Sequence, residues 1–212
     1  MDLKFEQLCP NVFQDQVLES DLWKSSLQIK STEQVMLHAP SGKGKTSFIY
    51  YLTGLRNDYT GTIFVDNNDI RTLTMNQWTN LRRTKFSVVY QDLQLFDQLT
   101  VKENISMLPE FAEGYSLESA RELVVYLGIE EKWESKTGVL SFGQKQRLAL
   151  VRSLMKPFDL LICDEPFSHL DLSNTSKCIE LIQRRVKEEN AGFIISCLDD
   201  IKLFNGVKTI HL

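Results

Sequence analysis

The sequence predicts an α/β fold built around a phosphate-binding loop, for three reasons. A glycine-rich loop at 39–47 lies between an apolar run with strand character and one with helical character. A second apolar run, at 160–163, ends in two adjacent carboxylates. After Asp171 the pattern predicts a helix at 179–186 and strands at 193–195 and 207–210, which would complete a two-layer or three-layer α/β core.

The N-terminal part of the chain is expected to add antiparallel strands to this core. Residues 1–34 and 60–75 are predicted to form an antiparallel β subdomain, and 61–66 has a clear strand pattern within it. One domain spanning 1–212 is expected, because 212 residues with 42% hydrophobic content can bury one core.

The loop at 39–47 fits the pattern of a phosphate cradle, except that Ala39 replaces the first glycine. A buried strand at 35–38 is predicted to enter the loop, and a helix at 47–52 to leave it. Backbone N–H groups would surround a β-phosphate, Lys45 would reach the β and γ oxygens, and the Thr46 hydroxyl would bind Mg²⁺. Taken alone, the loop could also be a surface turn. The residues predicted to hold the nucleotide are Ala39, Pro40, Ser41, Gly42, Lys43, Gly44, Lys45, Thr46 and Ser47.

Residues 97–155 are expected to form a helical subdomain. Apolar residues recur at helical spacing from Leu117 to Leu127, and Gly128 ends this run. Near its end the segment contains the string LSFGQ at 140–144, followed by a basic amphipathic run.

The carboxylates Asp164 and Glu165 follow the apolar run at 160–163, and Pro166 ends the strand. Side chains alternate along a strand, but at its end the second carboxylate can turn toward the same ligand. Asp164 is therefore predicted to bind Mg²⁺, and Glu165 to act on an attacking water. A buried strand that ends in a solvated acidic turn is the alternative.

Together these strings resemble the ATP-binding subunit of an ABC transporter. LSFGQ is similar to the LSGGQ signature of that family, with Phe142 in place of one glycine. The resemblance extends from about Ser26 to the C-terminus, and residues 91–105 are similar to the lipoprotein-release, macrolide-exporter and cell-division branch. The resemblance implies an ATP-hydrolysing subunit that closes head to tail with a second copy when ATP binds.

The resemblance also implies roles for further residues. Gln91 would lie near Mg²⁺ and the attacking water, and Asp171 would be the D-loop aspartate. The structural alternatives are a loop amide for Gln91 and helix N-caps for Ser141 and Asp171. The signature residues that would contact ATP held by the second subunit are Ser141, Phe142, Gly143 and Gln144.

Two further positions concern the base and the γ-phosphate of ATP. Phe13 is the candidate for stacking on adenine, and a core or turn phenylalanine is the alternative. The family places a switch histidine where this chain has Cys197. A thiol is a weak hydrogen-bond donor, so the resemblance predicts slow hydrolysis; a register that differs by one or two residues at this position is the alternative. For the whole protein, a degenerate, nucleotide-sensing subunit is a further alternative.

Composition limits the cellular compartments and the classes of partner that are compatible with this sequence. The net charge of −4 gives no general attraction to nucleic acid, and no apolar run is long enough to span a membrane. The four cysteines lack CxxC spacing, which fits a reduced setting. The resemblance therefore implies a cytoplasmic protein that is peripheral on the cytoplasmic face of a membrane. Its expected partners are a transmembrane permease and a second ATPase subunit in a homodimer.

The permease is expected to touch the segment at 91–96, where Leu93, Leu95 and Phe96 offer apolar surface. Burial of these side chains in the core is the alternative. A soluble ABC ATPase of DNA repair or translation is the alternative for the whole protein. Such relatives usually carry coiled-coil insertions or basic arms, and neither pattern is visible in this sequence.

Overall fold

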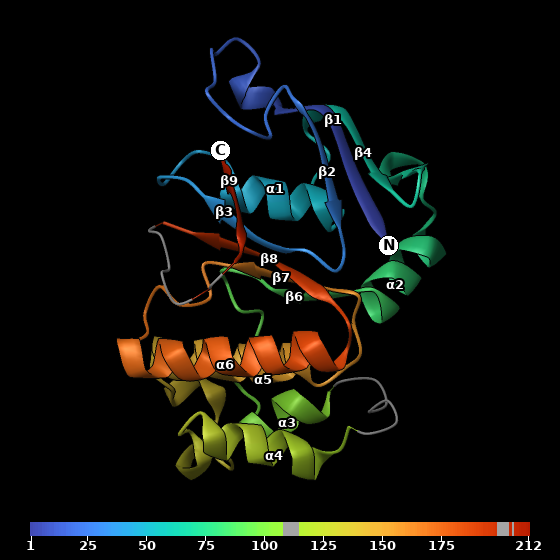
Figure 1. The fold of residues 1–212 in the computed structure, drawn as a ribbon. Coiled ribbons are helices and arrows are strands. Elements are labelled where there is room, and N and C mark those ends of the chain that lie inside the picture. Colours follow the sequence, from blue (N-terminus) through green and yellow to red (C-terminus); the bar gives the residue numbers. More distant parts are fainter. Residues whose placement is uncertain (108–114, 199–203, 205) are drawn as a thin grey trace.

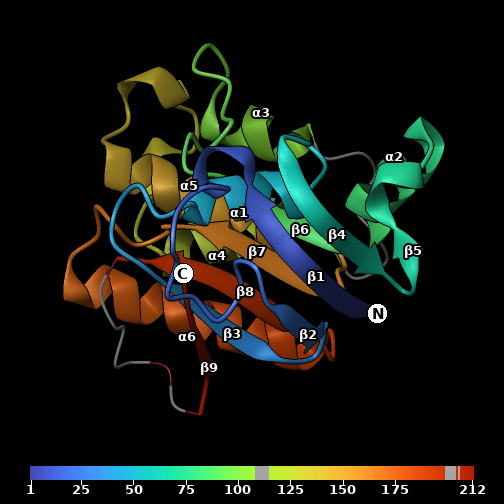
Figure 2. The ribbon, with the colours of Figure 1, turned by 90° about the horizontal axis from the view of Figure 1, so that it is seen from above.

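A computed structural model of the protein describes residues 1–107, 115–198, 204 and 206–212. Its elements form successive layers, which Figure 1 shows from top to bottom: an antiparallel sheet, the helix α1, a parallel sheet, the helices α5 and α6, and the helices α3 and α4. Seen from above, the antiparallel strands β1 and β4 lie in front of α1 (Figure 2). The α/β fold class predicted from the sequence is confirmed.

The parallel sheet forms the centre of the molecule, in the order β6-β7-β8-β3-β9. Its strands are rich in apolar residues and are covered on both faces, as is usual for parallel strands. All four pairs of neighbours are parallel, so the carboxyl ends of these strands share one edge of the sheet. The strands are β3 (Gln34–His38), β6 (Phe86–Val89), β7 (Leu160–Asp164), β8 (Gly192–Cys197) and β9 (Lys208–His211).

The antiparallel sheet has the order β2-β1-β4-β5. A register shift between Glu6 and Cys9 interrupts the pairing of β1 with β4, and Gln7 has the positive φ of 49° within this bulge. The strands are β1 (Asp2–Pro10), β2 (Ser26–Lys30), β4 (Tyr59–Val65) and β5 (Asn68–Asp69).

Most helices begin where a polar side chain satisfies the free N–H groups of the first turn. Thr74, Thr100, Ser116 and Ser141 each form a capping box, and Asp171 caps the last helix. The helix α1 has no side-chain cap and begins at Lys45, two residues earlier than the sequence predicts. The helices are α1 (Lys45–Leu52), α2 (Met75–Thr84), α3 (Val101–Ser106), α4 (Leu117–Tyr126), α5 (Phe142–Leu154) and α6 (Leu172–Glu188).

Two hydrophobic clusters lie on opposite faces of the parallel sheet. Along β8, Ile194 belongs to the cluster that contains residues of α1, whereas Phe193, Ile195 and Cys197 belong to the cluster that contains residues of α5 and α6. This alternation is the usual two-residue period of a strand. No helix within the described residues has the length and apolar character needed to cross a bilayer.

Candidate nucleotide site

The phosphate loop connects β3 to the N-terminus of α1. Gly42 and Gly44 have positive φ values of 79° and 93°, a region that glycine enters without the steric penalty of a side chain. The N–H groups of the first turn of α1 lack intrahelical partners and carry the positive end of the helix dipole. The loop therefore has the backbone geometry of an anion site.

Lys45 lies buried inside this loop with only 5% of its surface exposed. Its Nζ donates to the carbonyl oxygens of Ala39 at 2.7 Å and Pro40 at 3.2 Å. The same ammonium lies 3.2 Å from Oε1 of Glu165. The lysine of the loop and the carboxylate of Glu165, the residue directly after β7, thus meet although they are far apart in the sequence.

Asp164 provides an oxygen for which the described residues offer no partner. Its Oδ1 accepts a hydrogen bond from the Ser196 hydroxyl at 2.6 Å, whereas Oδ2 is buried and makes no hydrogen bond with any described residue. Burial raises the pKa of this carboxyl, and the neighbouring hydroxyls of Ser196 and Thr46 oppose that shift. A buried carboxylate oxygen without a partner is costly, and a cation ligand would satisfy it.

Two further oxygens, one at the start of α1 and one in the loop after β6, lie close together. The Thr46 hydroxyl donates to Oε1 of Gln91 at 3.3 Å, which joins α1 to the loop after β6. Carboxylate, amide and hydroxyl oxygens are donors that suit Mg²⁺. No group of three or more His, Cys, Asp or Glu side chains that could hold a metal occurs in the described part of the chain. Mg²⁺ bound here would complete its shell with phosphate oxygens and water, as is common for this ion.

The backbone of Glu165 turns out of the strand in a left-handed conformation, with φ of 48°. Its N–H donates to the Ser196 hydroxyl at 3.0 Å, and its carbonyl accepts from Nε2 of Gln146 at 3.3 Å. A non-glycine residue at this φ is strained and persists only where its surroundings hold it. These two hydrogen bonds hold the turn that brings the Glu165 carboxylate to Lys45.

The end of β8 presents two neighbouring side chains in different directions. Ser196 contacts the Asp164 carboxylate and the backbone N–H of Glu165, as described above. The Cys197 thiol donates to the carbonyl oxygen of Leu37 at 3.7 Å, and only 5% of the residue is exposed. A role for Cys197 at the γ-phosphate stays a prediction.

The signature lies at the start of α5 and contacts the loop before α6. Ser141 accepts from the N–H of Gln144 at 3.3 Å, and Oε1 of Gln144 accepts from the N–H of Ser141 at 2.9 Å. The Phe142 ring packs against His169 with a centroid distance of 4.4 Å. A Cβ on Gly143 would lie 2.8 Å from the His169 carbonyl oxygen, so this glycine permits the close approach.

Asp171 caps α6 by accepting the N–H of Asn174 at 2.8 Å. Among the described residues, no hydrogen bond or ion pair joins Asp171 or the signature residues to the phosphate loop. The fold therefore brings Lys45, Thr46, Gln91 and the two β7 carboxylates together, and leaves the signature and Asp171 outside that group.

Two aromatic residues lie against the phosphate loop. A Cβ on Gly44 would lie 3.2 Å from the Phe13 ring and 3.0 Å from the Trp23 ring, and the Trp23 indole N–H donates to the Lys43 carbonyl at 3.1 Å. Sequence reasoning missed Trp23, because a tryptophan about twenty residues before the loop belongs to no motif. Stacking of Phe13 on adenine stays a prediction.

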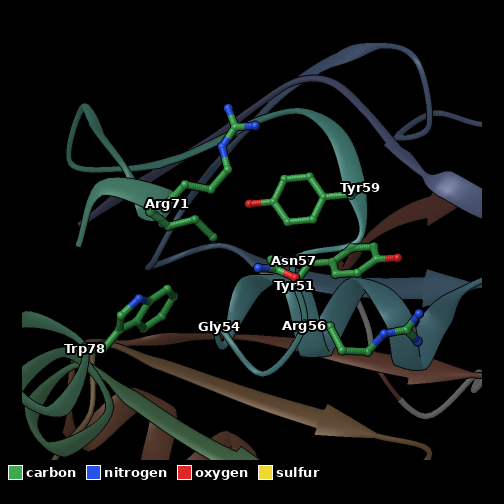
Figure 3. Close-up of a pocket in the computed structure, with 8 residues that line it drawn as sticks. Tyr51, Gly54, Arg56, Asn57, Tyr59, Arg71 and Trp78 are labelled. Atoms are coloured by element: carbon green, nitrogen blue, oxygen red, sulfur yellow. The ribbon is translucent and has the colours of Figure 1, made fainter. Parts of the chain in front are cut away.

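A cavity of about 300 Å³ lies at the other end of α1 (Figure 3). Tyr51, Tyr59 and Trp78 line it together with Arg56 and Arg71, and each arginine is paired with an aspartate two residues away. Burial raises the pKa of Tyr59 to about 12, so its hydroxyl stays protonated. The cavity is separate from the phosphate loop, because α1 lies between them.

Gly54 closes this cavity after α1, with φ of 69°, and a Cβ there would lie 2.5 Å from the Trp78 ring. Gly54→Ala should lower the free energy of unfolding by about 1–2 kcal/mol through left-handed backbone strain and by about 1–3 kcal/mol more through overpacking. Urea unfolding measures the change. Gly206→Ala is the control, because Gly206 has φ of 72° and no described atom within 4 Å of its Cβ. Equal decreases in the free energy of unfolding of the two variants would show that the contact with Trp78 does not contribute to the effect.

Comparisons with known proteins agree with this geometry. The family model described as ABC transporter matches residues 22–168. The lipoprotein-releasing system ATP-binding protein LolD of Hyphomonas neptunium is 34% identical over 176 residues, which cover 81% of this chain and 77% of LolD. The macrolide export ATP-binding/permease protein MacB of Aggregatibacter actinomycetemcomitans is 31% identical over 173 residues, which cover 80% of this chain but 27% of MacB.

A solved structure shows the same fold. The dimeric structure of a post-hydrolysis state of the ATP-binding cassette MJ0796, bound to ADP and Pi, covers 99% of this chain and 94% of its own, with a TM-score of 0.81 at 24% identity. The matched family model includes the phosphate loop, the signature and both β7 carboxylates. The chain therefore belongs to the ABC transporter family, as an ATP-binding subunit and an ATPase.

Proposed function

We propose that this chain hydrolyses Mg-ATP in a head-to-tail pair of identical subunits and thereby powers a membrane permease. One observation carries the proposal for the chemistry. The buried Lys45 ammonium contacts the Glu165 carboxylate, and the neighbouring Asp164 presents a buried oxygen without a partner among the described residues. A phosphate-binding cation, a base and a metal ligand thus lie together at the carboxyl edge of the sheet.

The phosphates of ATP would bind to the N–H groups of residues 42–47, with Lys45 donating to the β and γ oxygens. Thr46, Asp164 and Gln91 would hold Mg²⁺ through their side-chain oxygens, and this ion would neutralise phosphate charge. Once Lys45 donates to phosphate, the ion pair between Lys45 and Glu165 weakens. Glu165 then accepts the proton of the water that attacks the γ-phosphate.

A second copy would complete the site by presenting Ser141, Phe142, Gly143 and Gln144, with Asp171 beside them. Exposed apolar side chains flank this region in the single chain: Val139 is 74% exposed, Phe142 44% and Leu172 82%. Apolar surface of this kind is typical of a face that meets a partner. The dimeric MJ0796 cassette, which has the same fold, also supports the pair.

A permease partner is supported by the relatives, since LolD belongs to a lipoprotein-releasing system and MacB carries a permease within its own chain. It would place this protein on the cytoplasmic face of a membrane. Of the three apolar residues expected to face the permease, Leu93 is buried, Leu95 is partly buried in the core and Phe96 is 51% exposed. Phe96 is therefore the residue of this segment whose apolar side chain would contact the permease.

Two measurements test the proposal. The purified chain should hydrolyse ATP with Mg²⁺ and lose this activity in EDTA, and size-exclusion chromatography should show a dimer with Mg-ATP. Pull-down from solubilised membranes, followed by mass spectrometry, should recover a multi-span membrane protein. An active chain that recovers only soluble partners would remove the permease from the proposal, and a chain that binds no Mg-ATP would overturn the catalytic part.

Cys197→Ala should change the rate of ATP hydrolysis by less than about twofold, because a thiol donates weakly. Its hydrogen bond in this structure goes to the Leu37 carbonyl. Steady-state ATPase rates with the permease present provide the measurement. A loss as large as that of Glu165→Gln would show that the thiol itself takes part in hydrolysis.

A further inference from the structure

We propose that Ser196 is a positioning residue for hydrolysis, which sets the orientation of the Asp164 carboxylate and holds the turn at Glu165. The inference rests on the proposed function. It adds to the site a residue that belongs neither to the phosphate loop nor to the signature, and that is not one of the two carboxylates at the end of β7. Ser196 touches neither nucleotide nor metal in this proposal. It acts through the two groups that it contacts, the Asp164 carboxylate and the backbone N–H of Glu165.

The geometry around Ser196 uses both capacities of its hydroxyl. The Oγ–H donates to Oδ1 of Asp164 at 2.6 Å, and the same oxygen accepts the N–H of Glu165 at 3.0 Å. Ser196 is fully buried, with 0% of its surface exposed, so bulk water does not compete for these bonds. One hydroxyl therefore joins the metal-binding carboxylate to the backbone of the base.

Strand pairing explains why this serine reaches both residues. Asp164 and Ser196 are directly opposite in the parallel register of β7 and β8. The next residue, Cys197, belongs to the hydrophobic cluster on the face of α5 and α6 and donates to Leu37. The register of the sheet thus places Ser196 beside the Asp164 carboxylate.

The hydrogen bond to Oδ1 has a consequence for the other oxygen. The terminal torsion of an aspartate is broad, so a carboxylate without partners can rotate. With Oδ1 held by Ser196, Oδ2 remains the oxygen available for a cation. Groups that orient metal ligands in this way typically change metal affinity by about tenfold to a hundredfold when they are removed.

The bond from Glu165 supports the second carboxylate. The φ of 48° at Glu165 is a strained conformation, and its N–H is held by Ser196. Removing the hydroxyl would leave this N–H without that acceptor and free the turn to relax. The distance between the Glu165 carboxylate and Lys45 would then no longer be fixed.

Ser196→Ala tests the proposal through the Mg²⁺ dependence of nucleotide binding, measured with a fluorescent ATP analogue at graded Mg²⁺ and again in EDTA. The Mg²⁺ concentration for half-maximal binding should rise by about tenfold to a hundredfold. Binding in EDTA should stay within about twofold, because the phosphate loop is intact. Ser196→Thr, which keeps a hydroxyl, should recover most of the Mg²⁺ affinity.

Ser87→Ala is the matched control. Ser87 is also fully buried in the parallel sheet, but its hydroxyl donates to the Ser153 carbonyl. It should show the wild-type Mg²⁺ requirement, and thermal unfolding without nucleotide reports the stability of each variant. If Ser196→Ala does not fold, Ser196→Cys takes its place, since a thiol fills the space but donates weakly; it should show the same direction of change.

The outcomes separate this inference from the proposed function. A folded Ser196→Ala or Ser196→Cys protein with wild-type Mg²⁺ dependence would overturn the role of Ser196 and leave the ATPase intact. An equal loss of binding with and without Mg²⁺ would also overturn it, because that pattern indicates general damage. Wild-type protein that binds no Mg-ATP would overturn the proposed function and the inference together.

Discussion

Glu165→Gln is expected to lower the rate of ATP hydrolysis by about a hundredfold to ten-thousandfold, the usual contribution of a general base. The amide keeps the shape of the side chain but cannot accept the proton of the attacking water. ATP binding should persist, because Lys45 and the backbone of the phosphate loop are unchanged. The bound pair should therefore accumulate as a dimer.

Steady-state ATPase assays and size-exclusion chromatography with and without Mg-ATP measure the two effects. Glu118→Gln is the control, since Glu118 is an exposed glutamate in the first turn of α4. It should hydrolyse ATP at the wild-type rate and form no trapped dimer. A Glu165→Gln protein that hydrolyses ATP at the wild-type rate would remove Glu165 from catalysis.

Lys45→Ala is expected to weaken ATP binding by about 100-fold to 10,000-fold, because two hydrogen bonds to charged oxygens contribute about 1.5–3 kcal/mol each. The variant also removes the ion-pair partner of Glu165, whose side chain is only 15% exposed. A partly buried charge that loses its partner destabilises the fold. Thermal unfolding should therefore be measured beside equilibrium binding of labelled ATP.

Lys43→Ala is the matched control for this prediction, because Lys43 lies in the same loop but is exposed. Its affinity for ATP should stay close to that of the wild type. The assignment of Lys45 would be wrong if Lys43→Ala lost binding and Lys45→Ala kept it. Lys45→Met, which retains the length of the side chain, separates loss of charge from loss of packing.

The sequence alone predicted the parts of this protein that short strings encode. Glycine and lysine at fixed spacing predict a phosphate loop wherever they occur between a strand and a helix, and an apolar run before two carboxylates predicts a buried strand. The Ser141 and Asp171 caps follow from local hydrogen bonds of the kind that Ser and Asp make at helix starts. Such signals depend on neighbours within a few residues.

Other features depend on contacts between distant segments, which one sequence does not reveal. At the end of β8, position in the sequence alone indicates Cys197 as the residue near the γ-phosphate. Which of two adjacent side chains contacts the Asp164 carboxylate depends on the register of β8 against β7, where Ser196 lies opposite Asp164. Trp23 lies in the segment between β1 and β2, and its contact with Lys43 joins residues that are 20 positions apart.

The unsatisfied oxygen of Asp164 bears on how this protein would respond to selection. Natural sequences are mostly free of local frustration, and the exceptions gather at functional sites. Oδ2 of Asp164, which has no hydrogen-bond partner among the described residues, is such an exception. A laboratory screen that rewards heat resistance alone would accept uncharged replacements there, since burying a lone charge is unfavourable. Such variants would resist thermal unfolding better but would no longer hydrolyse ATP. Selection for stability in this protein therefore has to be combined with an assay of ATP turnover.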